Sequence, residues 1–140
     1  MALIADTGPL VALYDAGDRH HRAVRRIFER ERGAILIPGP ILTEVDYMLR
    51  RFLGVDAAID FLTGLSEGSL THEPLTPADI DRCAQILADY READIGLADA
   101  SVLALAERRQ IYRVLTLDQR DFRVLRPKGG KPLVLLPGDE

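Results

Sequence analysis

The stretch Ala2-Leu3-Ile4-Ala5-Asp6-Thr7-Gly8-Pro9 decides the architecture that we expect for this chain. Four apolar residues in a row are typical of a short strand that is covered on both faces. The Asp-Thr-Gly-Pro sequence that follows is typical of the turn between the end of a strand and the start of a helix. We therefore expect a buried strand over residues 2–5 with an acidic side chain, Asp6, at its carboxyl end.

The rest of the chain alternates between strand and helix patterns. Further strands are expected at residues 34–37, 70–75, 112–116 and 133–136, and the segment 70–75 reads as an edge strand. Helices are expected at residues 20–32, 56–65, 76–90 and 98–109, and from residue 40 to just before Gly54. Because strands alternate with helices, the sequence predicts an α/β fold with a parallel sheet of four to five strands, covered on both faces.

Length and composition favour a single domain over residues 1–140, since 47% of the residues are hydrophobic and can form a core. No apolar run reaches the roughly 18 residues that a membrane-spanning helix needs, and the N-terminus lacks the basic cluster of a signal peptide. We therefore expect a soluble, cytoplasmic protein with no membrane partner. The net charge of −4 argues against a plain polyanion-binding module.

Arginines nevertheless gather in two stretches, at residues 19–32 and 120–126. Two interpretations are open for them. The planar guanidinium suits a nucleic-acid backbone, but exposed arginines on a helix commonly pair with acids of neighbouring turns or of a protein partner.

Acidic side chains follow the carboxyl ends of the expected strands. Those near strand ends or helix starts are Asp6, Glu44, Asp94, Asp99 and Asp118. Because the functional crevice of a parallel sheet lies outside the carboxyl ends of its strands, we expect these carboxylates to converge there. Crowded carboxylates raise one another's pKa values unless a positive charge lies between them. The sequence therefore predicts a cation site at this edge of the sheet.

The chemistry of the ligands favours Mg²⁺ or Mn²⁺. Carboxylate oxygens suit these hard cations, whereas His20, His21 and His72 do not have the spacing of zinc ligands. A metal held in this way can activate a water molecule and neutralise charge on a leaving oxygen, which fits hydrolysis of a nucleic-acid phosphodiester.

Four short motifs carry these acids: Ala-Asp-Thr-Gly-Pro-Leu at 5–10, Ile-Leu-Thr-Glu-Val at 41–45, Asp-Ile-Gly-Leu-Ala-Asp-Ala-Ser-Val at 94–102 and Thr-Leu-Asp-Gln-Arg-Asp-Phe at 116–122. In this order and at these distances they resemble PIN-domain nucleases, and most closely the VapC-like toxins of type II toxin–antitoxin systems. The resemblance spans nearly the whole chain. It implies a PIN-like fold of three layers, α/β/α, around the central parallel sheet.

The resemblance also implies roles for individual residues. The catalytic and metal-binding quartet would be Asp6, Glu44, Asp99 and Asp118. Asp94 would be a supplementary metal ligand, and Asp121 either a ligand or a residue that caps the tight turn around it. Thr7 and Thr116 would supply groups that orient the acids and the bound water.

The function implied by the resemblance is that of an endoribonuclease dependent on Mg²⁺ or Mn²⁺, which hydrolyses RNA phosphodiester bonds with metal-activated water. As a toxin it would form a homodimer and would be blocked by a cognate antitoxin protein. A PIN-like RNA-processing nuclease and a catalytically inactive domain that binds RNA or protein are the alternatives within the same fold. The full set of acids argues against the inactive domain, because unpaired carboxylates without a metal are costly.

Two alternatives outside this fold family are disfavoured by specific residues. A phosphatase of the haloacid-dehalogenase type needs a second Asp two positions after the first, where this chain has Gly8. It also needs a helper lysine, and the only lysines, Lys128 and Lys131, lie in a late loop. The same lack of a lysine near the acids disfavours a receiver domain.

Overall fold

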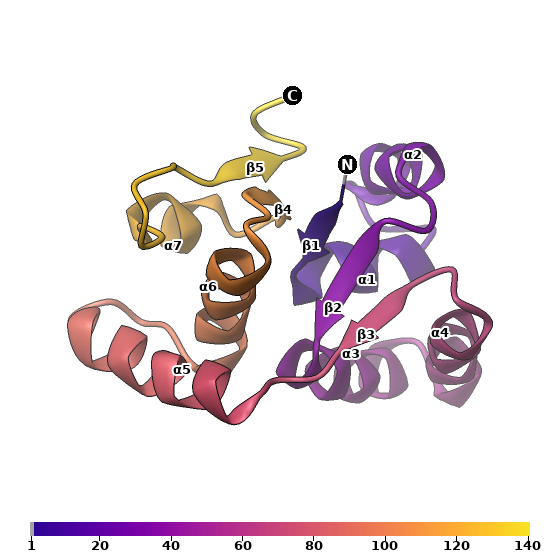
Figure 1. Cartoon of the computed structure of the whole chain (residues 1–140). Coiled ribbons are helices and arrows are strands. Elements are labelled where there is room, and N and C mark those ends of the chain that lie inside the picture. Colours follow the sequence, from indigo (N-terminus) through magenta and orange to yellow (C-terminus); the bar gives the residue numbers. More distant parts are fainter. Residues whose placement is uncertain (1) are drawn as a thin grey trace.

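The computed structural model describes residues 2–140 and has a five-stranded parallel sheet at its centre (Figure 1). The strands are β1 (Leu3–Ala5), β2 (Ile35–Pro38), β3 (Thr71–Glu73), β4 (Arg113–Leu115) and β5 (Val134–Leu136), arranged in the order β3-β2-β1-β4-β5. All neighbouring strands pair in parallel. The predicted α/β class, the number of strands and the edge position of the third strand are therefore confirmed.

Seven helices in the described part of the chain complete a three-layer α/β/α arrangement. They are α1 (Thr7–Tyr14), α2 (His21–Arg30), α3 (Gly39–Phe52), α4 (Val55–Glu67), α5 (Pro77–Asp89), α6 (Leu97–Arg109) and α7 (Gln119–Val124). Helix α5 packs on α6, while α3 contacts α1, α4 and α6. Within residues 2–140, no helix combines the length and the apolar character that crossing a membrane requires.

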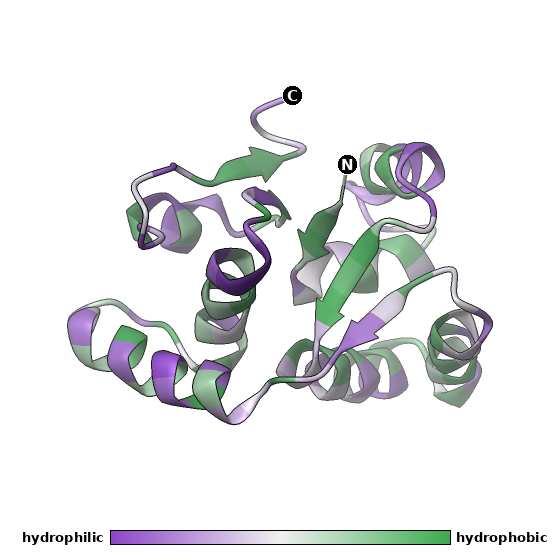
Figure 2. Ribbon diagram, in the orientation of Figure 1, coloured by the Kyte–Doolittle hydropathy of each residue, from purple (hydrophilic) through white to green (hydrophobic). Residues whose placement is uncertain are grey.

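The central strands form because their side chains are buried on both faces. Every residue of β1 and β2 is buried, and Ile4 of β1 lies in register with Leu36 of β2 and Val114 of β4. In Figure 2 these strands are mainly hydrophobic, whereas β3 at the edge is hydrophilic and its Thr71 and His72 are exposed. The continuous apolar runs in the sequence thus mark the middle of the sheet.

The sequence patterns did not predict where helices α1 and α7 begin and end. A helix was expected to follow Asp6, but without defined bounds. Helix α1 is mostly apolar and has no polar face, since its Thr7, Pro9 and Leu10 are all buried. It therefore lacks the periodicity of an amphipathic helix. Helix α7 has six residues, which is too short for a periodic pattern. Both helices begin directly after an acid, Asp6 or Asp118.

The order of the strands places a topological switch at β1. The chain leaves β1 toward β2 on one side, and the later strand β4 pairs with β1 on the other side. The connections diverge there, so a crevice forms outside the carboxyl ends of β1 and β4.

Candidate active site

This crevice contains a pocket of about 570 Å³ that collects all six acids singled out in the sequence. Its polar lining residues are Asp6, Thr7, Glu44, Asp94, Asp99, Asp118 and Asp121. These residues come from the ends of β1 and β4, from α3, and from the segments around the starts of α6 and α7. The expected convergence of acids from distant parts of the chain is therefore observed.

Asp6 is the most deeply placed of these acids and is only 7% exposed. Its backbone N–H donates to the carbonyl of Leu115 (2.9 Å), and its carboxylate accepts a hydrogen bond from the Thr116 hydroxyl (2.9 Å). Burial raises the pKa of Asp6, and the charges of Glu44 and Asp118 raise it further, against the opposing effect of its hydrogen bonds.

Thr116, which follows β4, connects two of the acids. Its fully buried hydroxyl donates to Oδ2 of Asp6 and accepts from the backbone N–H of Asp118 (3.0 Å). Because a hydroxyl carries a single hydrogen, these two bonds define its orientation. The Thr116 side chain thereby links the carboxyl ends of β1 and β4. It fixes the position of Asp6 relative to Asp118, the two acids that follow these strands.

Asp118 and Asp121 lie at the start of α7. The Asp118 carboxylate caps the helix by accepting the N–H of Asp121 (3.3 Å). Asp121 thus lies in the first turn of a helix and also lines the acidic pocket. Burial, the hydrogen bond with Asp118 and the negative charges of Asp118 and Asp94 raise its pKa, whereas Arg120 lowers it. Both interpretations of Asp121, a ligand or a residue of the turn, are compatible with this position.

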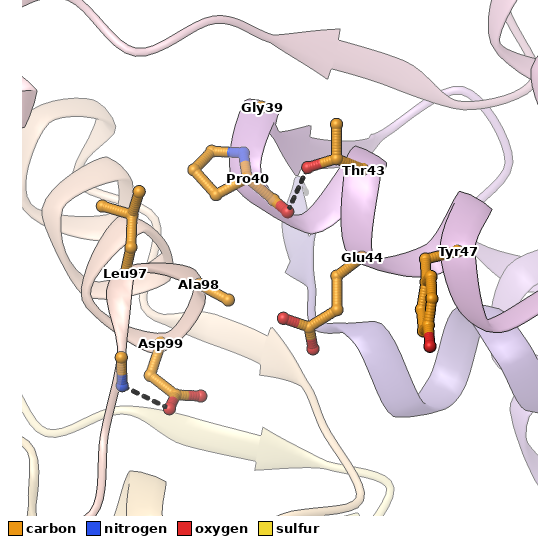
Figure 3. A pocket seen from close by; sticks show the side chains of 9 residues that line it. Gly39, Pro40, Thr43, Glu44, Tyr47, Leu97, Ala98 and Asp99 are labelled. Atoms are coloured by element: carbon orange, nitrogen blue, oxygen red, sulfur yellow. Dashed lines mark hydrogen bonds between the residues drawn. The ribbon is translucent and has the colours of Figure 1, made fainter.

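Asp99 and Glu44 face each other from α6 and α3. Asp99 accepts the backbone N–H of Gly96 (3.4 Å) in the first turn of α6. Its pKa is raised to about 6, chiefly by burial and then by the charges of Asp6, Asp121 and Asp118. Glu44 is exposed, and in Figure 3 its carboxylate points toward the side of the pocket where Asp99 lies.

The residues of the pocket fit a hard divalent cation by their chemistry. Their ligand atoms are all oxygens, and among its described lining residues there is no cationic side chain. The Thr7 hydroxyl is buried and has no hydrogen-bond partner within residues 2–140. No three His, Cys, Asp or Glu side chains of the described chain are already close enough to coordinate an ion. The carboxylates would therefore have to draw together around one, which would offset their repulsion.

A second pocket, of about 770 Å³, shares Glu44 and Asp99 with the acidic pocket. Its other lining residues come from the starts of α3 and α6 and are Gly39, Pro40, Thr43, Tyr47, Gly96, Leu97 and Ala98 (Figure 3). Since the two pockets have these acids in common, they form one groove, which we call the α3–α6 groove. Sequence reasoning missed Tyr47 and Leu97, although Tyr47 follows Glu44 at the three-residue spacing of one helix face.

Other charged residues lie outside the groove. Asp46, two residues after Glu44 on α3, lines neither part of the groove and pairs with Arg50 (3.4 Å). Arginines of both clusters form ion pairs, such as Arg25 with Glu29 (3.0 Å) and Arg123 with Asp139. These contacts favour the interpretation of local pairing over that of a cationic path beside the acids.

Comparisons with known proteins agree with this geometry. The family model of the PIN domain matches residues 3–126. The chain is 34% identical to Ribonuclease VapC26 of Mycobacterium tuberculosis over 135 residues, which cover 96% of this chain and 100% of that protein.

Solved structures share the fold. VapC20 of Mycobacterium tuberculosis, described as a sarcin–ricin loop cleaving toxin, superimposes with a TM-score of 0.78 at 20% identity, over 84% of this chain and 91% of that chain. The DNA-bound VapBC of Salmonella typhimurium gives a TM-score of 0.73 at 18% identity, over 96% and 98%.

An α/β/α fold with acids converging at the switch point of the sheet is the arrangement that the resemblance to PIN-like proteins predicts. The chain belongs to the PIN domain family and, within it, is similar to the VapC proteins along nearly its whole length. The resemblance inferred from the four sequence motifs is thereby confirmed.

Proposed function

We propose that this protein is a ribonuclease of the VapC type that depends on Mg²⁺ or Mn²⁺, cuts RNA internally and acts as the toxin of a toxin–antitoxin pair. The observation that carries the proposal is the convergence of six carboxylates in one pocket, with no cationic side chain among its described lining residues. The identity of 34% to Ribonuclease VapC26 over 96% of the chain supports the same activity.

In this proposal, Asp6, Glu44, Asp99 and Asp118 hold the metal, Asp94 is a supplementary ligand, and Asp121 is either a ligand or a residue of the turn; all six line the pocket. A bound Mg²⁺ or Mn²⁺ would activate water and neutralise the charge that builds on the leaving oxygen. Thr116 keeps the Asp6 carboxylate in place through its hydroxyl. The Thr7 hydroxyl, which has no hydrogen-bond partner among the described residues, can orient a water molecule in the pocket.

We further propose that residues 1–140 act as a single PIN-like domain in the cytoplasm, with an antitoxin protein as partner. The antitoxin is supported by the structural relatives, one of which is a VapBC complex from Salmonella typhimurium and another a toxin–antitoxin complex from Klebsiella pneumoniae. A homodimer is supported by apolar side chains exposed around α4. These are Phe52, Leu53, Val55, Ile59 and Leu62. A patch of this kind on a protein surface commonly marks an interface.

Cleavage of a mixed pool of RNA tests the activity. The purified protein should cut RNA with Mg²⁺ or Mn²⁺ but not with EDTA, and Asp6→Asn should abolish the cutting. Asp81→Asn, at an exposed carboxylate of α5 that lines neither part of the groove, is the matched control and should cut as the wild type does. Cleavage in EDTA, or cleavage by Asp6→Asn at the wild-type rate, would contradict the proposal.

Sequencing of RNA ends after brief expression in cells separates a toxin from the two alternatives. A sharp cut in one transcript supports a toxin. Diffuse trimming would indicate an RNA-processing nuclease, and an absence of new ends would indicate an inactive binding domain.

A further inference from the structure

An exposed aromatic side chain lies beside the acids on α3. Tyr47 is 54% exposed and lines the α3–α6 groove together with Glu44 and Asp99. It follows Glu44 by three residues, so both side chains project from the same side of the helix, about 4.5 Å apart along its axis. Figure 3 shows the ring edge-on, on the side of Glu44 that is away from Asp99.

The rest of the groove suits a flat, uncharged group. Apart from the two acids, it is lined by Gly39, Pro40, Thr43, Gly96, Leu97 and Ala98, none of which is charged. A Cβ atom at Gly96 would meet no atom within 4 Å, so no other side chain fills the space beside this lining residue. A planar ring that enters beside Tyr47 would therefore meet only uncharged residues apart from Glu44 and Asp99.

Two arginine side chains lie next to Tyr47 toward the C-terminal end of α3. A smaller pocket of about 270 Å³ is lined by Tyr47, Arg50 and Arg51. Arg50 is engaged with Asp46, whereas Arg51 lies over the ring of Phe52 at 5.8 Å. Arg51 is seven residues from Glu44, which puts it on the same face and about 10 Å along the axis. That distance is on the order of three nucleotide steps in a stacked strand, at about 3.4 Å each.

We propose that α3 guides single-stranded RNA away from the acids, with a base stacked on the ring of Tyr47 and a backbone phosphate held by Arg51. An aromatic ring gives sequence-tolerant stacking to any base, and a cation beyond it follows the backbone; this combination is typical of proteins that bind single strands. The inference rests on the proposed ribonuclease activity and names a positioning residue for its substrate. Tyr47 holds the strand and takes no part in bond cleavage.

Binding of RNA measured by fluorescence anisotropy tests the role of the ring. The probe is a 12-nucleotide single-stranded RNA of mixed sequence, and all variants carry Asp99→Asn to suppress cleavage. Adding Tyr47→Leu should weaken binding by about 5- to 150-fold, the usual contribution of one base stacked on an aromatic side chain. Tyr47→Phe should bind within about twofold of the parent, because the ring remains. Ile80→Ala, which removes an apolar side chain that is 56% exposed on α5 and lines neither part of the groove, is the control and should also stay within about twofold.

A strand of ribose phosphate without bases distinguishes stacking from other effects. Tyr47→Leu should bind this abasic strand as the parent does, since no base is present to stack. An equal loss on both strands, or no loss on the intact RNA, would overturn the inference. No loss of binding to the intact RNA would indicate that the groove binds a protein ligand instead. Wild-type protein that neither binds nor cuts RNA would instead refute the proposed function, and the role of Tyr47 with it.

Salt dependence tests Arg51 separately. Arg51→Gln should reduce the slope of log affinity against log salt by about 0.7, the value for one phosphate contact on a single strand. Arg22→Gln, at an exposed arginine of α2 that lines neither part of the groove, should leave the slope unchanged. Equal slopes for wild type and Arg51→Gln, or equal losses for the two variants, would overturn the contact with phosphate.

Discussion

Replacing Asp99 by Asn should stabilise the metal-free protein, although it should also damage the proposed metal site. The pKa of Asp99 is raised from 3.8 to about 6 in the folded state, because the carboxylate is partly buried among other acids. The folded protein therefore holds this proton more tightly than the unfolded chain does. The charged form costs stability, and Asn removes the charge while keeping an oxygen that can accept the N–H of Gly96.

The size of the effect follows from the two pKa values. The difference between 3.8 and about 6 corresponds to about 3 kcal/mol, at about 1.4 kcal/mol per pH unit. Because the side chain is only partly buried, solvent screening reduces the expected gain in unfolding free energy to about 1–2 kcal/mol. For a chain of 140 residues this is a rise in Tm of about 3–8 °C.

The pH dependence has a defined sign. The Asp99 charge does not lower the free energy of unfolding below a pH of about 3.8, and it lowers it to the full extent above a pH of about 6. Wild-type protein in EDTA should therefore lose stability, relative to Asp99→Asn, as the pH rises through this window, and the difference should be largest at pH 8.

Thermal unfolding in EDTA at pH 5 and pH 8 measures this, with Asp81→Asn as the control, which should stay within about 0.5 kcal/mol of the wild type. Mg²⁺ should then raise the Tm of the wild type more than that of Asp99→Asn, since a ligand stabilises the state that binds it. A variant that is less stable than the wild type at pH 8 in EDTA, or a difference independent of pH, would refute the electrostatic reasoning.

Three further predictions concern other contacts. Thr116→Val removes the hydroxyl that joins Asp6 to the N–H of Asp118, so the unfolding free energy should fall by about 1–3 kcal/mol and the affinity for Mg²⁺, measured by calorimetry, by about 10- to 100-fold. An unchanged affinity for Mg²⁺ would show that the Thr116 hydroxyl does not position Asp6 and Asp118 as metal ligands. Glu107→Ala removes the ion-pair partner of Arg82, which is mostly buried and lies 2.7 Å away, and denaturant unfolding should show a loss of about 3 kcal/mol. A loss below about 1 kcal/mol would indicate that solvent screens this pair. Ile59→Glu places a charge in the exposed apolar patch and should convert the proposed homodimer to a monomer in light scattering; a monomeric wild type would contradict the dimer itself.

The parts of the fold that could be predicted from the sequence are those with a strong local signal. Buried apolar runs such as residues 34–37 identify the central strands, and the Thr76–Asp79 capping box marks the start of α5, where the two reciprocal hydrogen bonds are 3.0 and 3.1 Å long. Because parallel strands share one carboxyl edge, the convergence of the acids followed from the order of these elements alone.

Other features depend on tertiary contacts and leave no such signal. The range of α1 was missed because its burial on several sides removes the amphipathic pattern. The tail after residue 136 could not be assigned, since its placement comes from ion pairs with distant residues, Arg30 with Glu140 and Arg123 with Asp139. Tyr47 was missed because exposure of an aromatic ring beside an acid is visible only once the groove is formed.

The bond between Asp6 and Thr116 joins residues that are 110 positions apart, and this has a consequence for protein synthesis. Translation proceeds from the N-terminus, and β4 has to emerge and align with β1 before Asp118 can reach the other acids. An unfinished chain therefore carries its earlier carboxylates on segments that nothing yet holds together. The acidic pocket can therefore assemble only late in synthesis, once the chain has been made beyond Asp118 and β4 has paired with β1.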